Sequence, residues 1–361
     1  MSYGKVVERD VESNFGLLPE TFESYNIVEP NDIVMRLTDL QNDQRSLRTG
    51  QVTEQGVITS AYVTIVPSAD LTPRFAHYLL HGYDLAKVFY RMGGGLRQSL
   101  KYADLKHLPL LVPPHSEQTR IANFLDEQTA RIDALIAEKE RLVEKLTEII
   151  ISSVGKCLEV ENGNWSRLLY ACTTVSRPVD QQDGESYRRL GLFNRGRGIF
   201  IRDDTDKDDM GDSEFFWVEA GDLVISGQFA WEGAVALAAP EHSGCVVSHR
   251  FPVIRGRDGV VLTEYLFALL MTQFGEFVLN DCARGSAGRN RPLNMGLLMK
   301  WKIPIPPRAQ QEEIAALVRL REGLRKVSEH SATLLREYRS SLISAAVTGQ
   351  LDIDTCGREV A

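Results

Sequence analysis

The sequence lacks the features that mark membrane-spanning, secreted and disulfide-rich proteins. None of its apolar runs approaches the roughly 18 residues of a transmembrane helix. Its first residues (MSYGKVVERDVES) contain no apolar segment of the kind found in a secretory signal. The 5 cysteines are odd in number and form no C-x-x-C pair, which argues against a disulfide framework and a zinc site. We therefore expect a cytoplasmic protein with no membrane partner.

Motifs for enzymatic chemistry are also missing. The sequence has no GxxxxGK[ST] phosphate loop, no GxGxxG after a strand, no GxSxG elbow and no adenine-methylase NPPF, NPPY or DPPY motif. The glycine-rich stretch GGGLRQS (93–99) lacks the lysine of a phosphate loop. We therefore predict a protein that is not an enzyme and has no cofactor.

Two groups of residues match part of a metal-binding pattern but lack the remaining ligands. The stretch DDTDKDD (203–209) has aspartates at the alternate positions of a calcium loop, but an aspartate also stands where that loop requires glycine. His77 and His81 are four residues apart on a predicted helix, but no third ligand accompanies them. A solvated acidic loop and a pair of helix histidines are the better interpretations, so we predict no metal.

The charge distribution leaves room for a nucleic-acid partner although the net charge is −8. Residues 1–32 and 203–214 hold most of the excess acid. Residues 284–308 hold six basic residues and no acid, and residues 85–107 hold five basic residues against one acid. Local sign decides whether a surface binds phosphate, so these two basic stretches are candidate contacts.

A repeat with a constant offset of 193 residues organises the chain. VPPHSEQTRIANFL (112–125) recurs as IPPRAQQEEIAALV (305–318), and SSVGKCL (152–158) recurs as AAVTGQL (345–351). Upstream the matches continue with small drifts in the offset: VEPNDIV (28–34) with VEAGDLV (218–224), ITSAYVTIV (58–66) with VVSHRFPVI (246–254), and LTPRFAHYLL (71–80) with LTEYLFALL (262–270). The chain is therefore predicted to use one structural unit twice.

The second part of each copy is predicted to be a long helix. A Pro-Pro pair prevents helix before it, and Ser116 or Thr119 is a candidate N-cap in the first copy. Apolar residues then follow at steps of four and three, which is typical of a coiled coil. The stripe consists of Ile121, Leu125, Ile132, Leu135, Leu142, Leu146 and Ile149 in the first helix, and of Leu317, Leu320, Leu324, Val327, Leu334 and Tyr338 in the second. Each helix has about 40 residues and spans roughly 60 Å, and the nearest partner for each stripe is the other helix.

The part of each copy that precedes the long helix is predicted to be an α+β domain. Short β-branched runs bounded by Gly, Pro and Asp indicate strands at 62–66, 222–227, 233–239 and 245–256. The segments 71–92 and 262–280 are each predicted to be a single helix. Trp165 to Leu169 opens the second domain, and the first domain has no counterpart, so we expect it to be incomplete at its start.

These motifs resemble the specificity subunit of type I restriction–modification systems. The family pattern PP-x-x-EQ-x-x-IA-x-FLD-x-x-TA-x-ID-x-LI-x-x-K stands here as Pro113 through Lys139. NDIVMRLTDLQNDQRSLR, GVITSAY and GGGLRQSLKYADLKHLP also look like one of its target-recognition domains, NWSRL (164–168) like its usual domain opening, and AAVTGQL (345–351) like its usual helix ending. The second helix departs from the pattern at 318–320, where the first helix has 125–127.

The resemblance implies a fold, a function and partners. The expected fold is α+β, with two target-recognition domains in tandem, each followed by a long helix, and the two helices paired as an antiparallel coiled coil. The expected division is 1–112, 113–158, 159–305, 306–351 and a tail at 352–361. Each domain would read one half of a bipartite target in double-stranded DNA. The helices would act as a spacer and dock two methyltransferase subunits, with the restriction subunit joining through the complex.

Candidate DNA contacts are side chains that can read base edges or bind phosphate. In the first copy they are Arg36, Gln41, Asn42, Arg45 and Arg48 of one polar stretch, with Arg97 and Gln98 farther along. In the second copy they are Arg284, Arg289, Asn290 and Arg291 among Gly and Ser, with Arg195 and Arg197 as weaker candidates. The alternative for each group is a solvated loop.

Two functions remain open on the sequence. The first is a non-catalytic DNA-recognition subunit. The second is a coiled-coil interaction scaffold, or a degenerate or split specificity subunit with impaired DNA reading, and the shortened start of the first domain is compatible with it.

Overall fold

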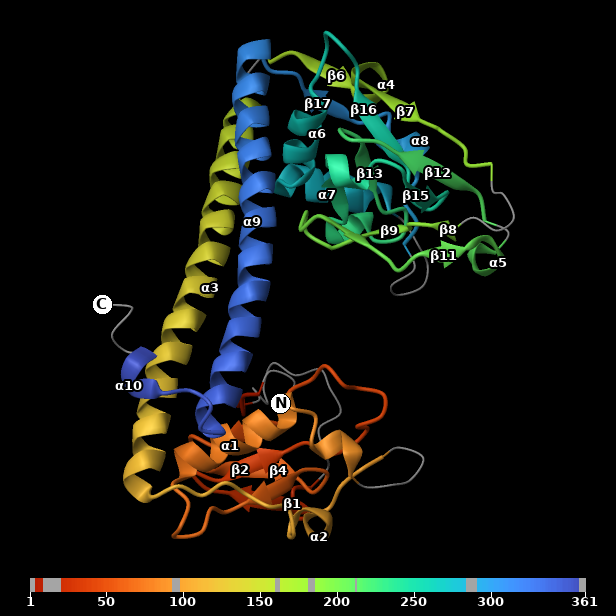
Figure 1. The fold of residues 1–361 in the computed structure, drawn as a ribbon. Coiled ribbons are helices and arrows are strands. Elements are labelled where there is room, and N and C mark those ends of the chain that lie inside the picture. Colours follow the sequence, from red (N-terminus) through yellow and green to blue (C-terminus); the bar gives the residue numbers. More distant parts are fainter. Residues whose placement is uncertain are drawn as a thin grey trace. The chain divides into compact units, whose positions relative to one another are not determined.

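The fold is known from a computed structural model that describes residues 4–8, 21–92, 98–159, 163–180, 186–211, 213–283 and 291–356 (Figure 1). It separates into two compact units. The first comprises Met1–Lys139 and Glu329–Ala361, and the second comprises Glu140–Ser328. No helix in the described ranges is both long enough and apolar enough to cross a bilayer.

The first unit is built on a three-stranded antiparallel sheet in which β2 lies between β3 and β5. The β2 residues are fully buried, as expected for an apolar run in a central strand. A separate antiparallel pair joins β1 to β4. The strands are β1 (Tyr25–Val28), β2 (Ile33–Met35), β3 (Thr49–Gln51), β4 (Gly56–Thr59) and β5 (Val63–Ile65).

The segment 71–92, expected to be one helix, is a helix followed by a separate 3₁₀ turn. Helix α1 (Pro73–Leu85) starts with a proline in its first turn, where the missing N–H has no cost. It ends because Lys87 adopts a left-handed conformation with φ 58°, which no helix can continue through. The 3₁₀ turn η1 (Phe89–Arg91) and the short helix α2 (Tyr102–Leu105) follow.

The second unit contains a four-stranded antiparallel sheet in the order β14-β13-β16-β7, surrounded by four two-stranded pairs. The sheet strands are β7 (Cys172–Val175), β13 (Leu223–Ile225), β14 (Val235–Leu237) and β16 (Val253–Gly256). The pairs are β6 (Trp165–Arg167) with β17 (Lys302–Pro304), β8 (Ser186–Tyr187) with β11 (Thr205–Asp206), β9 (Leu190–Leu192) with β10 (Ile199–Ile201), and β12 (Phe215–Val218) with β15 (Cys245–Ser248). Short helical elements connect them: α4 (Leu168–Ala171), α5 (Lys207–Met210), η2 (Ala230–Glu232), η3 (Pro240–His242) and α8 (Met295–Leu298).

The segment 262–280, also expected to be one helix, is divided into α6 (Thr263–Leu270) and α7 (Gln273–Cys282). Thr272 causes the break, because its side chain accepts the Gly275 N–H at 3.2 Å and so caps the second helix. The turn is tight enough to require glycine at 275, where a Cβ would lie 2.4 Å from the Leu269 carbonyl oxygen.

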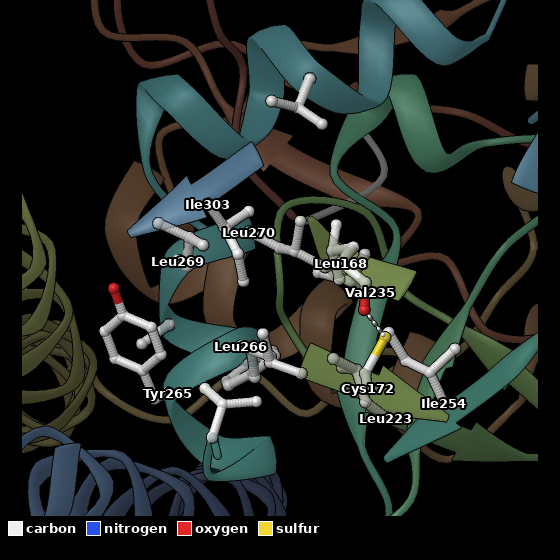
Figure 2. Close-up of a cluster of buried hydrophobic side chains, with 14 of the residues drawn as sticks. Leu168, Cys172, Leu223, Val235, Ile254, Tyr265, Leu266, Leu269, Leu270 and Ile303 are labelled. Carbon is white, nitrogen blue, oxygen red and sulfur yellow. Dashed lines mark hydrogen bonds between the residues drawn. The ribbon is translucent and has the colours of Figure 1, made fainter. Parts of the chain in front are cut away.

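The main core of the second unit lies between α6 and the four-stranded sheet (Figure 2). Leu223 and Ile254 of adjacent strands face Leu266 of α6 there. Leu168 and Cys172 close one side of this core, and the Cys172 Sγ donates to the Leu168 carbonyl at 3.2 Å. The opening segment of the second domain is thus a structural part of its core.

The duplication is visible in a repeated turn before the central strand. Asp32 accepts the Glu29 N–H at 2.9 Å, and Asp222 accepts the Glu219 N–H at 2.9 Å. Both aspartates are buried and both stand directly before a buried strand, β2 in one unit and β13 in the other. The sequence repeat at 28–34 and 218–224 is therefore also a structural repeat.

Two long helices, α3 (His115–Leu158) and α9 (Arg308–Val347), appear as predicted (Figure 1). In the first unit, one hydrophobic cluster contains residues of both helices, namely Ile132, Ile136, Ala332, Leu342 and Ile343. In the second unit another cluster does the same with Ile150, Val154, Cys157, Ile314 and Val318. A short helix α10 (Ile353–Cys356) follows α9.

The predicted apolar stripe is buried at Ile121, Leu125 and Ile132, but its register is wrong farther along α3 and over much of α9. Leu135, Leu142 and Ile149 of α3 are 41–49% exposed, while Ile136 and Ile150 beside them are buried. In α9, Leu320, Val327, Leu334 and Tyr338 are 52–60% exposed. The buried face of these helices includes polar residues, namely Gln118, Thr129, Gln311, Arg321 and Ser328. Beyond Ile132, the spacing of apolar residues therefore selects a face that is exposed.

Candidate nucleic-acid interface

The first-unit candidates lie on a loop that follows β2. Gln41, Asn42 and Arg45 are exposed there, and Arg36 is half-buried at its start. Asp43 shapes the loop by accepting the Ser46 N–H at 3.0 Å and the Arg45 N–H at 3.2 Å. These hydrogen bonds, chiefly those from Ser46, lower the pKa of Asp43 to about 2. The loop therefore presents an arginine and two amides on a fixed backbone.

Arg48 is not a DNA contact, because its side chain is fully buried. Its guanidinium donates to the Tyr90 hydroxyl and to the Thr38 carbonyl, each at 3.1 Å, and to the Asp43 carbonyl. Its backbone N–H donates to a carboxylate oxygen of Asp84 at 2.6 Å. The expectation for this residue was wrong: Arg48 holds the loop from beneath.

Gln98 also has a structural role. Its side-chain amide donates to the Tyr90 carbonyl at 2.9 Å and the Met92 carbonyl at 2.7 Å, so both of its N–H donors are used inside the chain. The Leu40 N–H donates to the Gln98 carbonyl at 3.0 Å. The two candidate stretches of the first copy are therefore neighbours in space, although they lie far apart in the sequence.

Four candidates, Arg97, Arg284, Arg289 and Asn290, lie outside the described residues. Arg291 is half-buried, and its guanidinium lies 4.9 Å from the ring centre of Trp231, a cation–π distance. The Leu293 N–H donates to the Gly227 carbonyl at 2.8 Å. This segment is thereby attached to the loop 226–233.

Arg195 and Arg197 are exposed on a turn that packs against the same loop 226–233. The Arg195 N–H donates to the Glu232 carbonyl at 3.0 Å, and Arg195 itself has a left-handed conformation with φ 58°. The side chain of Arg197 donates to the Asn194 carbonyl at 3.0 Å. The structure therefore brings Arg195, Arg197 and Arg291 to one loop. The position of Arg291, far from the other two in the sequence, does not reveal this.

A groove of about 500 Å³ beside this loop holds residues that the sequence analysis missed. Three arginines line it against a single carboxylate, that of Glu232, which also accepts a hydrogen bond from Asn194. The remaining lining includes two amides, two serine hydroxyls and aromatic rings. The lining includes Arg189, Arg202, Arg250, Asn194, Gln228, Ser248 and Phe229. Arginine and amide side chains are those that bind phosphate and read guanine and adenine edges.

A buried arginine of α9 supports the turn that carries Arg195 and Arg197. Arg321 donates to the Gly196 carbonyl at 3.0 Å and to the Thr147 hydroxyl at 2.9 Å. A Cβ at Gly198 would lie 2.7 Å from the guanidinium of Arg325. In the second unit the candidate turn is therefore held by the long helices.

A buried glutamine joins each globular part to the start of its own long helix. Gln118 accepts the Thr72 N–H at 2.8 Å and donates to the Asp70 carbonyl at 2.8 Å and the Pro113 carbonyl at 2.9 Å. Its side chain is fully buried. The same side-chain atoms thus bind both the loop before α1 and the Pro-Pro turn before α3.

Gln311 repeats this arrangement in the second unit. It accepts the Leu262 N–H at 2.9 Å and donates to the Val260 carbonyl at 3.1 Å and the Pro306 carbonyl at 2.9 Å. Gln118 and Gln311 are 193 residues apart and belong to the repeated Pro-Pro motif. We call them the bridging glutamines.

The described residues contain no cluster of three or more metal-binding side chains. His77 and His81 belong instead to the interior of the first unit, with ring centres 5.9 Å apart. The His81 ring is hydrogen-bonded to the Thr49 hydroxyl at 3.2 Å. Burial, with a smaller effect of nearby positive charge, lowers the pKa of His77 to about 4 and that of His81 to about 3.

These pKa values predict acid sensitivity of the first unit. Both pKa values lie below 6.5 in the folded chain, so the unfolded chain binds more protons between pH 6.5 and 4 and stability falls as pH falls. At pH 5.5 the free energy of unfolding is expected to be about 2–3 kcal/mol lower than at pH 7.5. Urea unfolding followed by hydrogen exchange of α1 measures this. The double variant His77→Leu/His81→Leu is expected to lose the dependence, and the exposed control His115→Gln to keep it.

A family model for the type I restriction modification DNA specificity domain matches residues 48–145. The chain carries a specificity domain of this family. The match contains the motif from Pro113 to Lys139, so the family resemblance seen in the sequence is confirmed. The specificity domain as matched includes the loop support from Arg48, the bridging glutamine Gln118 and the first part of α3.

A solved structure shares the fold of this chain, while no curated protein matches its sequence. It is a chain from a study entitled "Structural basis underlying complex assembly and conformational transition of the type I R-M system", 15% identical with a TM-score of 0.55, over 91% of this chain and 85% of that chain. The HsdS subunit from Thermoanaerobacter tengcongensis is 16% identical with a TM-score of 0.40, over 90% and 82%. The S subunit of a type I restriction-modification system from M. genitalium is 15% identical with a TM-score of 0.47, over 89% and 84%.

Proposed function

We propose that this specificity protein is the non-catalytic DNA-recognition subunit of a type I restriction–modification complex. The proposal includes one target-recognition domain in 1–112 and another in 159–305, each of which reads half of a bipartite target. The observation that carries it is the convergence of exposed arginines and amides on loops in both units, in a chain that carries a specificity domain. Phosphate and base contacts need these side chains on a rigid support.

The long helices are proposed to pair as an antiparallel coiled coil that spaces the two half-sites. Residues of both helices share one hydrophobic cluster in each unit, which supports the pairing. The helix segments 113–158 and 306–351 would then form a stiff connection whose length sets the distance between half-sites.

The outer faces of the same helices are proposed to dock the methyltransferase subunits, two per chain, with the restriction subunit joining through them. Seven apolar side chains lie exposed on these faces: Leu135, Leu142 and Ile149 on α3, and Leu320, Val327, Leu334 and Tyr338 on α9. Exposed apolar residues at seven-residue spacing are typical of a face that packs against further helices.

The groove of the second unit is expected to contribute to DNA affinity. The double variant Arg202→Ala/Arg250→Ala should weaken binding and reduce the salt dependence, because each lost phosphate contact lowers the slope of log K against log salt by about 1. Gel-shift titrations at several salt concentrations measure both. Arg131→Ala, an exposed arginine on α3, is the matched control and should change neither. If the intact chain shows no salt-dependent shift, the protein is an interaction scaffold rather than a DNA reader.

The apolar faces predict which substitutions separate the complex. Leu142→Asp/Ile149→Asp should abolish co-purification with the methyltransferase subunit while leaving DNA binding by the isolated chain unchanged, because both side chains are already exposed. Leu169→Asp changes an equally exposed leucine away from the long helices and should preserve the complex. Retention of the complex by the double variant would contradict docking on this face.

A further inference from the structure

The first unit contains an apolar cavity at a place that the second unit fills with its own chain. The cavity has about 170 Å³, and its lining includes Ile33, Ile65, Leu79, Leu105 and Leu110. Ile33 pairs with Ile65 across β2 and β5, as Leu223 pairs with Ile254 across β13 and β16. The offset of 193 places Leu105 on Leu298 and Leu110 on Ile303.

In the second unit these counterparts pack against the opening segment 164–175. Leu168 and Cys172 of that segment belong to the same hydrophobic cluster as Leu223, Ile254 and Ile303 (Figure 2). Both side chains are almost fully buried. The first-unit cavity therefore corresponds to the space that Leu168 and Cys172 occupy in the second unit.

The sheet of the first unit has an open edge beside this cavity. In the second unit β7 pairs with β16 through four residues, 172–175, and completes a four-stranded sheet. In the first unit β5 pairs with β2 alone among the described residues. Its Val63, Thr64 and Ile65 are partly exposed, whereas Ile254 of β16 is 0% exposed. An unpaired edge flanked by apolar side chains is a template for an added strand.

The segment before α3 is exposed in the same way. Leu110, Leu111 and Val112 are 37%, 50% and 49% exposed, whereas the corresponding Ile303 and Ile305 are 1% and 9% exposed. In the second unit this segment is strand β17, which pairs with β6 at 165–167. Residues 109–111 form no strand.

Backbone groups that hold the opening segment are also available in the first unit. The Leu168 N–H donates to the Trp301 carbonyl at 2.9 Å, and the Ile305 N–H donates to the Asn164 carbonyl at 2.7 Å. Their counterparts, the Leu108 carbonyl and the Val112 N–H, make no backbone hydrogen bond within the described ranges. The described N-terminal stretch does not cover this site, because Val6 packs with Val34 on the other face of β2.

We propose that this cavity and the edge of β5 form a binding site for a peptide segment of a separate polypeptide. The segment would have the pattern of residues 164–175: a short strand, a turn that buries one leucine and a small apolar side chain, and a second strand added to β5. Binding would pair the β5 edge and cover Leu110, Leu111 and Val112. The site is distinct from the candidate DNA contacts and does not depend on the proposed function.

A labelled synthetic peptide with the sequence of residues 163–176 tests the proposal on the full-length chain by fluorescence anisotropy. We expect saturable binding and new hydrogen-exchange protection at the β5 amides that do not bond to β2. The variant Leu110→Asp should weaken binding about 10–100-fold, because the contact of one buried leucine contributes about 1.5–3 kcal/mol. Since Leu110 is already exposed, its unfolding transition should be unchanged.

The control variant Val57→Asp, at an exposed position on β4, should bind the peptide normally. A peptide with aspartate at the positions of Leu168 and Cys172 should not bind. Absence of saturable binding, or equal binding by Leu110→Asp, would overturn the proposal. So would protection, in the chain alone, of the β5 amides that do not bond to β2, since the chain itself would then fill the site.

Discussion

Replacing Gln311 by leucine is expected to lower the free energy of unfolding of the second unit by about 3–5 kcal/mol. The substitution keeps much of the side-chain volume but leaves one N–H and two carbonyl groups, those of Leu262, Val260 and Pro306, without their partner. Each buried polar group that loses its hydrogen bond costs about 1–3 kcal/mol. The effect should be large because all three groups depend on one amide.

Tryptophan fluorescence makes this measurement specific, because all 4 tryptophans lie in the second unit. Urea unfolding of Gln311→Leu should therefore show a shifted midpoint by fluorescence. The adjacent Gln310→Leu is the matched control, since Gln310 is exposed and its nearest partner is the Cys157 Sγ at 3.9 Å. A shift of equal size in both variants would mean that the bridging glutamine has no special role.

Arg48→Met is expected to destabilise the first unit by about 3–5 kcal/mol and to abolish DNA binding by that unit. Methionine fills part of the buried space but cannot donate to the Thr38 and Asp43 carbonyls or to Tyr90. The loop would then lose the support that fixes its exposed side chains. The loop would keep the bond from Lys87 to the Gln44 carbonyl at 2.5 Å and the bond from the Leu40 N–H to the Gln98 carbonyl at 3.0 Å.

Arg45→Met distinguishes a residue that contacts DNA from one that holds the loop in place. Arg45 is exposed, so its loss should leave the hydrogen exchange of β2 and β3 unchanged while the slope of log K against log salt falls by about 1. Arg48→Met should instead accelerate exchange in both strands. Normal exchange and normal DNA affinity in Arg48→Met would refute a supporting role for this residue.

The sequence predicts the large-scale architecture well because the repeat and the helix-forming segments are local properties. A constant offset of 193 residues is enough to locate both long helices and to pair the two bridging glutamines. It does not reveal that the glutamines are buried, because glutamine is mostly an exposed residue. The cue was their recurrence five residues after the first proline of each Pro-Pro pair.

The helical register could not be predicted, because the contacts that decide it are between distant residues. Arg321 is buried because the Thr147 hydroxyl, the Gly196 carbonyl and the Glu322 carboxylate take up its donors. The neighbouring Leu320 is apolar and would be expected to be the buried residue of the two, yet it is exposed. The same reasoning applies to Arg48, whose partners lie up to 42 residues away.

The groove arginines were missed for a related reason. Arg189 and Arg202 lie in a stretch, 188–202, that holds five arginines and no acid, a cue that was overlooked, and Arg250 lies on a separate segment. The antiparallel pairing of β9 with β10 brings Arg189 near Arg202, and a parallel bridge between Arg189 and Val246 joins them to β15, which Arg250 follows. Thr272, by contrast, is a residue type that commonly caps helices, so a second helix could have been predicted after it. The break was overlooked because the apolar pattern continues through it.

The division of the chain has a consequence for its synthesis. The second unit is one continuous stretch, Glu140–Ser328, whereas the first needs both Met1–Lys139 and the final stretch Glu329–Ala361. On the ribosome the first globular part therefore emerges first but waits for the last residues, which supply Leu342, Ile343 and Val347 to the cluster around α1. Until then that apolar surface stays uncovered, so the half translated earliest is the half that matures last.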